Sequence, residues 1–124
     1  MAEPKTVLVA DVESMLRRLV RATLRDRRLR ILEAATGDET LALAQHEHPD
    51  LVLLDVGLPG LDGYAVCRAL KADPATAGIK VVMLTARAQR QDIEQGAAVG
   101  ADAYITKPFS PQRLLGEVDG FLRD

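Results

Sequence analysis

The chain has 124 residues and a formal net charge of −2 at pH 7, and 48% of its residues are hydrophobic although it has only two Tyr, two Phe and no Trp. This length fits one domain with its own core, while the few aromatic rings exclude a broad stacking platform for single-stranded nucleic acid or carbohydrate. One cysteine, Cys67, excludes an internal disulfide, and without a signal peptide or an apolar run of membrane-spanning length we expect a soluble cytoplasmic protein with no membrane partner.

Apolar runs alternate with amphipathic segments in the first half of the chain. Strands are predicted at residues 5–10, 30–35 and 50–55, and helices at residues 14–27 and, after a helix start at 36–40, at 41–47. Pro49 ends the second helix, because proline disfavours helical geometry in the residue before it. The third strand is a continuous apolar run that stops at Asp55 and a Pro/Gly loop, which is typical of a strand buried on both faces of a parallel sheet.

The same alternation continues through the second half. A third helix begins near Tyr64 and stops at Asp73 and Pro74, and it is followed by a strand at 79–84, a helix at 89–99 and an edge strand of mixed polarity at 101–106. Ser110 is a suitable N-cap and Pro111 a suitable first residue for a last helix that runs to 122. Five strands alternating with five helices predict one α/β domain over residues 1–124, with a parallel sheet.

The first predicted helix is basic, although the rest of the chain is acidic. Residues 1–30 contain eight Lys/Arg and four Asp/Glu, and the remainder contains eight and fourteen. Apolar and threonine positions at helical spacing mark its packed side, namely Met15, Leu16, Leu19, Val20, Thr23 and Leu24, and Arg17, Arg18, Arg21 and Arg25 fall largely on the other side. Because no Lys/Arg excess follows elsewhere, we expect an acidic protein partner for this face and no nucleic-acid partner.

Functional groups follow four of the five predicted strands. They are Asp11 and Glu13 after the first, Asp55 after the third, Thr85 after the fourth and Lys107 after the fifth. The carboxyl ends of parallel strands share one edge of a sheet, and neighbouring carboxylates repel unless a cation lies between them. Mg²⁺ favours such oxygens, and a lysine and a hydroxyl nearby suit phosphoryl oxygens. The pattern therefore indicates phosphoryl chemistry, with Asp55 as the attacking carboxylate.

Four segments resemble the motifs of response-regulator receiver domains of two-component signalling, in order and spacing. They are residues 7–13 (VLVADVE), 53–63 (LLDVGLPGLDG), 82–86 (VMLTA) and 100–109 (GADAYITKPF). The resemblance extends over essentially the whole chain. It implies a flavodoxin-like, doubly wound fold with five parallel strands in the order 2-1-3-4-5 and five helices.

The resemblance also implies a role for each site residue. Asp55 accepts a phosphoryl group from a histidine kinase or histidine-phosphotransfer protein, and Mg²⁺ is held by acids after the first strand, by Asp55 and by the carbonyl of Gly57. Thr85 and Lys107 contact the phosphoryl oxygens. The chain is then no conventional enzyme but an acceptor that promotes its own phosphorylation and dephosphorylation. The acidic partner of the first helix is, in this family, a histidine-phosphotransfer protein.

Further implications concern the output side. The resemblance implies a cis peptide between Lys107 and Pro108, and a switch in which Thr85 and Tyr104 report phosphorylation to a downstream protein that binds the fourth helix, fifth strand and fifth helix. Arg87 lies at a position that tunes phosphoryl lifetime in the family, although a solvated arginine is an equally good interpretation. Since no output domain follows residue 124, we expect a stand-alone receiver, unless the chain is part of a longer one.

Val12 departs from the family pattern. The family usually has two adjacent acids after the first strand, and the second binds the metal directly, but valine offers no ligand. We therefore expect Mg²⁺ to bind weakly through Asp11, Asp55 and the Gly57 carbonyl, with Glu13 as a further candidate ligand. Two alternatives stay open, namely that Val12 packs harmlessly and the site works normally, or that the chain is a phosphorylation-independent pseudo-receiver that serves as a protein-interaction module.

Two other classes of protein share parts of this pattern, namely flavodoxin-like cofactor binders and phosphatases of the haloacid-dehalogenase type. A flavodoxin-like cofactor binder needs a Ser/Thr/Gly-rich phosphate loop where this chain is acidic. A phosphatase of the haloacid-dehalogenase type would use Asp11 with an acid two residues on, but such enzymes are longer and add a cap. Phosphorylation of Asp55 would support a receiver, and phosphorylation of Asp11 would support such a hydrolase.

His46 and His48 are expected at the surface, and Cys67 in the core.

Overall fold

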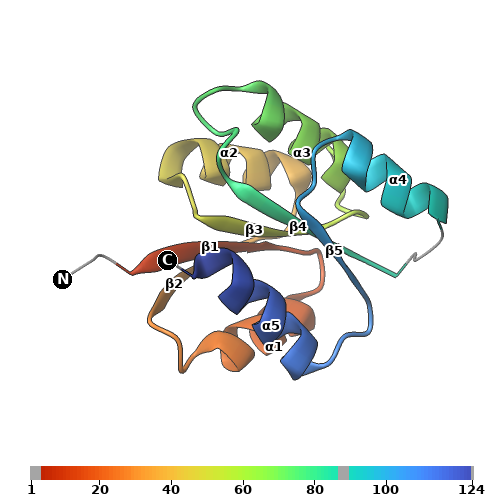
Figure 1. Cartoon of the computed structure of the whole chain (residues 1–124). Helices are drawn as coiled ribbons and strands as arrows, with labels where there is room; N and C mark the ends of the chain where they lie inside the picture. The colour runs from red at the N-terminus through yellow and green to blue at the C-terminus, as the bar shows by residue number, and fades with distance from the viewer. Residues whose placement is uncertain (1–3, 87–89, 124) are drawn as a thin grey trace.

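The chain folds into a five-stranded parallel sheet covered by helices on both faces (Figure 1). The structure is a computed structural model and describes residues 4–86 and 90–123. The strands are β1 (Lys5–Ala10), β2 (Leu29–Ala34), β3 (Leu51–Asp55), β4 (Lys80–Thr85) and β5 (Ala103–Thr106), and the helices are α1 (Ser14–Leu24), α2 (Gly37–Glu47), α3 (Gly63–Ala72), α4 (Arg90–Ala98) and α5 (Pro111–Leu122). Their order in the sheet, β2-β1-β3-β4-β5, confirms the predicted fold class and strand order.

The core consists of two layers, one on each face of the sheet. In β3, Leu51 and Leu53 face the layer shared with α1 and α5, whereas Val52 and Leu54 face the layer that contains residues of α2 and α3. Figure 1 shows α1 and α5 on one face and α2, α3 and α4 on the other. The alternation follows from strand geometry, in which successive side chains point to opposite faces. Cys67 is buried in the second layer, as predicted.

Element boundaries differ from the sequence-based expectation at a few places. Helix α1 ends at Leu24 rather than near residue 27, because residues 25–28 are all charged and offer no apolar side chain to pack. Helix α2 ends at Glu47, as predicted, and its C-cap His48 adopts the left-handed conformation (φ 47°) and donates its backbone N–H to Ala44 O. The predicted start of the fourth helix at residue 89 and the position of Arg87 lie outside the described residues. Among residues 4–86 and 90–123, no helix is both long and apolar enough to cross a membrane.

Two glycines hold the loop after β3 against the helices beside it. The backbone N–H of Gly37, at the start of α2, donates to Pro59 O at 3.1 Å, and the N–H of Gly63 donates to Val56 O at 2.9 Å. A Cβ on Gly37 would lie 1.7 Å from Leu61 O, and one on Gly63 would lie 2.4 Å from the Asp55 carbonyl oxygen. Only glycine permits these approaches, so both positions shape the loop that carries Asp55.

Gly37→Ala is expected to lower the free energy of unfolding by about 1–3 kcal/mol, because the added methyl group forces α2 away from the loop after β3. Chemical denaturation monitored by circular dichroism measures the change. Gly116→Ala in α5 is the matched control, since among the described residues nothing beyond the adjoining residues and backbone of α5 lies within 4 Å of the place its methyl group would take, and helix propensity favours alanine by up to about 1 kcal/mol. Equal stability of Gly37→Ala and the wild type would contradict the packing argument.

Candidate functional site

A cleft of about 570 Å³ lies at the carboxyl edge of the sheet, where the sequence predicts the functional groups. It is lined by Glu13, Asp55, Val56, Gly57, Asp62, Tyr64, Thr85, Ala86, Gln95 and Lys107. Strands β1 and β3 are neighbours in the sheet and end at the same edge, so Asp11 and Asp55 meet there. Five of the cleft residues were not among the predicted site residues, namely Val56, Asp62, Tyr64, Ala86 and Gln95. Asp62 also caps α3, since its side chain accepts from Ala65 N.

Lys107 joins the two aspartates. Its Nζ lies 2.6 Å from Asp11 Oδ2 and 3.3 Å from Asp55 Oδ1. Asp11 is fully buried and Asp55 is 8% exposed, so both carboxylates depend on a nearby cation. Burial of Lys107 disfavours its charged form, but the hydrogen bond and the charge of Asp11, with a smaller contribution from Asp55, outweigh burial and raise the pKa of Lys107 above its ordinary value.

Backbone N–H groups orient the two carboxylates. Glu13 N donates to Asp11 Oδ1 at 2.9 Å, and Gly57 N donates to Asp55 Oδ1 at 3.3 Å. Both are hydrogen bonds from a residue two positions on, which short acidic side chains form readily at the end of a strand. Asp11 therefore has both oxygens engaged, one by Glu13 and one by Lys107.

Thr85 and Tyr104 lie on neighbouring strands and interact. Thr85 ends β4 and is buried, and its side chain shares a hydrogen bond with that of the half-buried Tyr104 on β5. Burial raises the pKa of Tyr104, while the hydrogen bond with Thr85 acts in the opposite direction. The peptide bond between Lys107 and Pro108 is cis, as the resemblance implied, and Lys107 N donates to Thr85 O at 2.7 Å. The two predicted switch residues are thus brought together beside the cleft.

The residues present fit a magnesium ion only in part. Asp11, Asp55 and the Gly57 carbonyl offer oxygen ligands of the right chemistry, and Glu13 lines the same cleft. Val12 is 51% exposed and supplies no ligand. The alternative that the site works normally despite Val12 stays a prediction. Within the part of the chain that the structure describes, no group of three or more His, Cys, Asp or Glu side chains is arranged to hold a metal ion.

Helix α1 is rotated relative to the orientation predicted from its periodicity. Met15 and Leu19, expected on the packed side, are 71% and 45% exposed, whereas Val20 and Leu24 are buried. Arg17, expected to face solvent, turns inward, and its Nε donates to Glu33 Oε1 at 3.0 Å. The one available signal was Glu33, a lone acid in the apolar second strand, which needs a cation from the helix above it.

An apolar hollow lies next to the cleft, between α1 and the segment that follows β5. It measures about 370 Å³ and is lined by Glu13, Leu16, Leu19, Ala86, Lys107, Pro108 and Phe109. Lys107 borders both spaces, so the hollow adjoins the site.

His46 and His48 are exposed, as predicted. Burial raises the pKa of the Cys67 thiol to about 11, which makes Cys67 an inert core residue.

Comparison with known proteins identifies relatives over nearly the whole chain. The family model of the response regulator receiver domain matches residues 7–119. The phosphate regulon transcriptional regulatory protein PhoB of Pseudomonas aeruginosa is 40% identical over 119 residues, which cover 96% of this chain and 52% of that protein. The chain thus spans about half the length of the curated relatives it matches.

Solved structures agree with this match. A response regulator from Chloroflexus aurantiacus is 33% identical with a TM-score of 0.91, and the alignment covers 98% of this chain and 99% of that one. The BeF3-activated receiver domain of DrrB from Thermotoga maritima is 31% identical with a TM-score of 0.88, over 98% and 99% of the two chains.

Proposed function

Because the chain belongs to the response regulator receiver domain family, we propose that it is a signalling switch that accepts a phosphoryl group on Asp55 from a histidine phosphoprotein. One observation supports this above all: Asp55 ends the central strand β3, opens to the cleft and lies 3.3 Å from Lys107 Nζ. The BeF3-activated form of the DrrB receiver domain supports the same chemistry in a relative.

The proposed phosphoryl transfer is a displacement at phosphorus that takes place in one step. A carboxylate oxygen of Asp55 attacks phosphorus, the P–N bond to the donor imidazole breaks, and an acyl phosphate forms on Asp55. Lys107 and the Thr85 hydroxyl contact the phosphoryl oxygens, and Asp11 keeps Lys107 in place. Asp11, Asp55 and the Gly57 carbonyl, with Glu13 as the further candidate, would hold a magnesium ion, which would neutralise part of the negative charge there.

Incubation with acetyl phosphate and Mg²⁺ is expected to add the mass of one phosphoryl group to the wild type and none to Asp55→Asn, because the amide is not a nucleophile. Intact-protein and peptide mass spectrometry measure the adduct and its position. Asp73→Asn, a change at an exposed loop residue that caps its own turn, is the control and should be phosphorylated normally. Modification of Asp11 would instead support a hydrolase-type acceptor and overturn the proposal.

A second candidate function rests on Val12. Its exposed apolar side chain stands where the family's direct metal ligand is expected, which favours a pseudo-receiver that binds proteins without phosphorylation. The same mass measurement separates the two functions: an unmodified wild type that also fails to bind beryllofluoride in Mg²⁺ supports the pseudo-receiver.

We propose that the missing carboxylate at position 12 weakens Mg²⁺ binding. Val12→Asp is expected to tighten Mg²⁺ binding by about tenfold or more, since a charge near 4 Å contributes from about 1 kcal/mol in water to about 4 kcal/mol near a protein surface. Titration followed by the Gly57 amide resonance or by calorimetry gives the affinities. Val12→Asn is the control, because asparagine has the shape of aspartate but no charge. The charge argument would be contradicted if Val12→Asp bound Mg²⁺ no more tightly than the wild type, or no more tightly than Val12→Asn.

The proposed phosphodonor docks on helix α1. Of the three arginines of α1 and Arg25 at its C-cap, Arg17 and Arg21 are engaged by Glu33, which leaves the exposed Arg18 and Arg25 to meet an acidic partner. Exposed Met15 and Leu19 add an apolar patch beside the hollow.

The downstream protein is proposed to bind α4, β5 and α5. That the receiver is cytoplasmic, acts alone and takes no nucleic acid stays a prediction, since its curated relatives include longer transcriptional regulators.

Leu19→Asp is expected to slow phosphotransfer from a phosphorylated histidine-phosphotransfer domain about tenfold or more, because an acid on this patch repels an acidic partner and removes apolar contact. The rate with acetyl phosphate should stay the same, since a small donor needs no helix surface. Stopped-flow or gel-based transfer assays measure both rates. Ala42→Asp, at an exposed position of α2, is the matched control; an equal loss with acetyl phosphate would place Leu19 in the site itself and contradict docking.

A further inference from the structure

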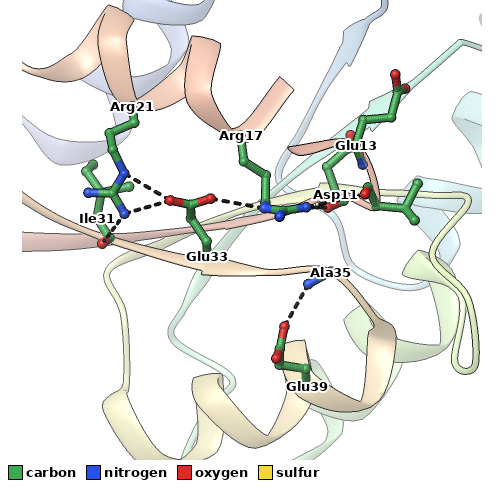
Figure 2. A network of polar contacts seen from close by, with 9 residues as sticks. Asp11, Glu13, Arg17, Arg21, Ile31, Glu33, Ala35 and Glu39 are labelled. Atoms are coloured by element: carbon green, nitrogen blue, oxygen red, sulfur yellow. Dashed lines mark hydrogen bonds and ion pairs between the residues drawn. The ribbon is translucent and has the colours of Figure 1, made fainter. Parts of the chain in front are cut away.

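Arg17 holds the backbone of the acidic segment that follows β1. Its Nη1 donates to Asp11 O at 2.7 Å and to Val12 O at 3.3 Å. Figure 2 shows the guanidinium between Glu33 on one side and Asp11 on the other. Its side chain is only 18% exposed, so these hydrogen bonds are partly shielded from water.

Glu33 fixes the other end of this guanidinium. Glu33 Oε1 accepts from Arg17 Nε at 3.0 Å, and Oε2 accepts from Arg21 Nε at 3.0 Å. Burial of Glu33 disfavours its charged form, but hydrogen bonds from Arg21 and Arg17 outweigh burial and lower the pKa of Glu33 below its ordinary value. Glu33 lies opposite Val9 in the register of β1 and β2, two residues before Asp11. Glu33, which holds Arg17, is therefore fixed in position by the pairing of β2 with β1.

The two carbonyls that Arg17 binds belong to Asp11 itself and to the next residue, so they hold the backbone from which the Asp11 side chain projects. That side chain meets Lys107 at 2.6 Å, and Lys107 in turn meets Asp55. A chain of direct contacts thus runs from Glu33 through Arg17 and Asp11 to Lys107. A carboxylate at position 12 could bind a metal ion and so hold this segment, but Val12 cannot. In this chain Arg17 holds the segment instead.

We propose that Arg17 is a positioning residue, which holds the Asp11–Val12 backbone so that Asp11 and Lys107 are aligned for phosphorylation of Asp55. This inference rests on the proposed function of Asp55. Arg21 offers a matched comparison: it shares Glu33 and lies one turn along α1, but its remaining hydrogen bond goes to Ile31 O, on β2. Arg17→Gln and Arg21→Gln change the net charge equally and each removes one partner of Glu33.

Arg17→Gln is expected to slow phosphorylation of Asp55 by acetyl phosphate at least about tenfold at fixed Mg²⁺, because small displacements of aligned groups cost large factors in rate. Arg21→Gln should stay within about twofold of the wild type. Arg17→Lys should not restore the rate, since an ammonium lacks the planar fork that reaches Glu33 and two carbonyls together. Equal rates for wild type and Arg17→Gln, or an equal loss in Arg21→Gln, would overturn the inference.

A second readout tests the inference without phosphorylation. The Glu13 amide donates to Asp11 Oδ1, so its NMR resonance and its hydrogen-exchange protection report the position of Asp11. Both should change in Arg17→Gln and stay near wild type in Arg21→Gln at equal overall stability. If the wild type accepts no phosphoryl group, the proposed function fails, yet this amide still decides the positioning role: an unchanged Glu13 resonance in Arg17→Gln overturns it.

Discussion

The ion pair of Lys107 with two buried aspartates is the constraint on which the site depends. Two carboxylates at neighbouring strand ends repel in a cleft partly shielded from water, and the ammonium of Lys107 makes their proximity tolerable. The strand order explains why a lysine is suited to this task. Lys107 follows β5 and Asp11 follows β1, with β3 and β4 between them, so only a long side chain crosses the edge of the sheet.

The elements around the cleft act as a frame for that ion pair. Gly37 and Gly63 let two helices press on the loop after β3, and this close packing fixes where Asp55 lies. On the opposite side of the site, Arg17 and Glu33 hold the segment after β1. Asp55, the proposed acceptor, thus lies between two supported segments and borders the cleft. Such preorganisation reduces the reorganisation needed when a phosphoryl group arrives.

The sequence was informative where buried strands end and less so where helix rotation matters. Asp55 and Lys107 could be predicted to meet, because continuous apolar runs define parallel strands whose carboxyl ends share an edge. The rotation of α1 could not, since Arg17 fits the polar side of a helical wheel as well as a buried ion pair. Helical periodicity counts apolar residues, and here a charge on β2 decided which face turns inward. The exposure of Met15 and Leu19 follows from the same rotation.

Val12 and Arg17 bear on how the segment after β1 is ordered when position 12 carries no carboxylate. A carboxylate at position 12 would orient the segment only when a cation is bound, so part of the binding energy would be spent on ordering the backbone. In this chain the cation is a guanidinium of the protein itself, held at its other end by Glu33. The segment is then ordered before any ion arrives. On the proposed magnesium site, valine at position 12 would lower the attraction for Mg²⁺, while the anchor by Arg17 would lower the cost of ordering the segment, so the two effects would act in opposite directions.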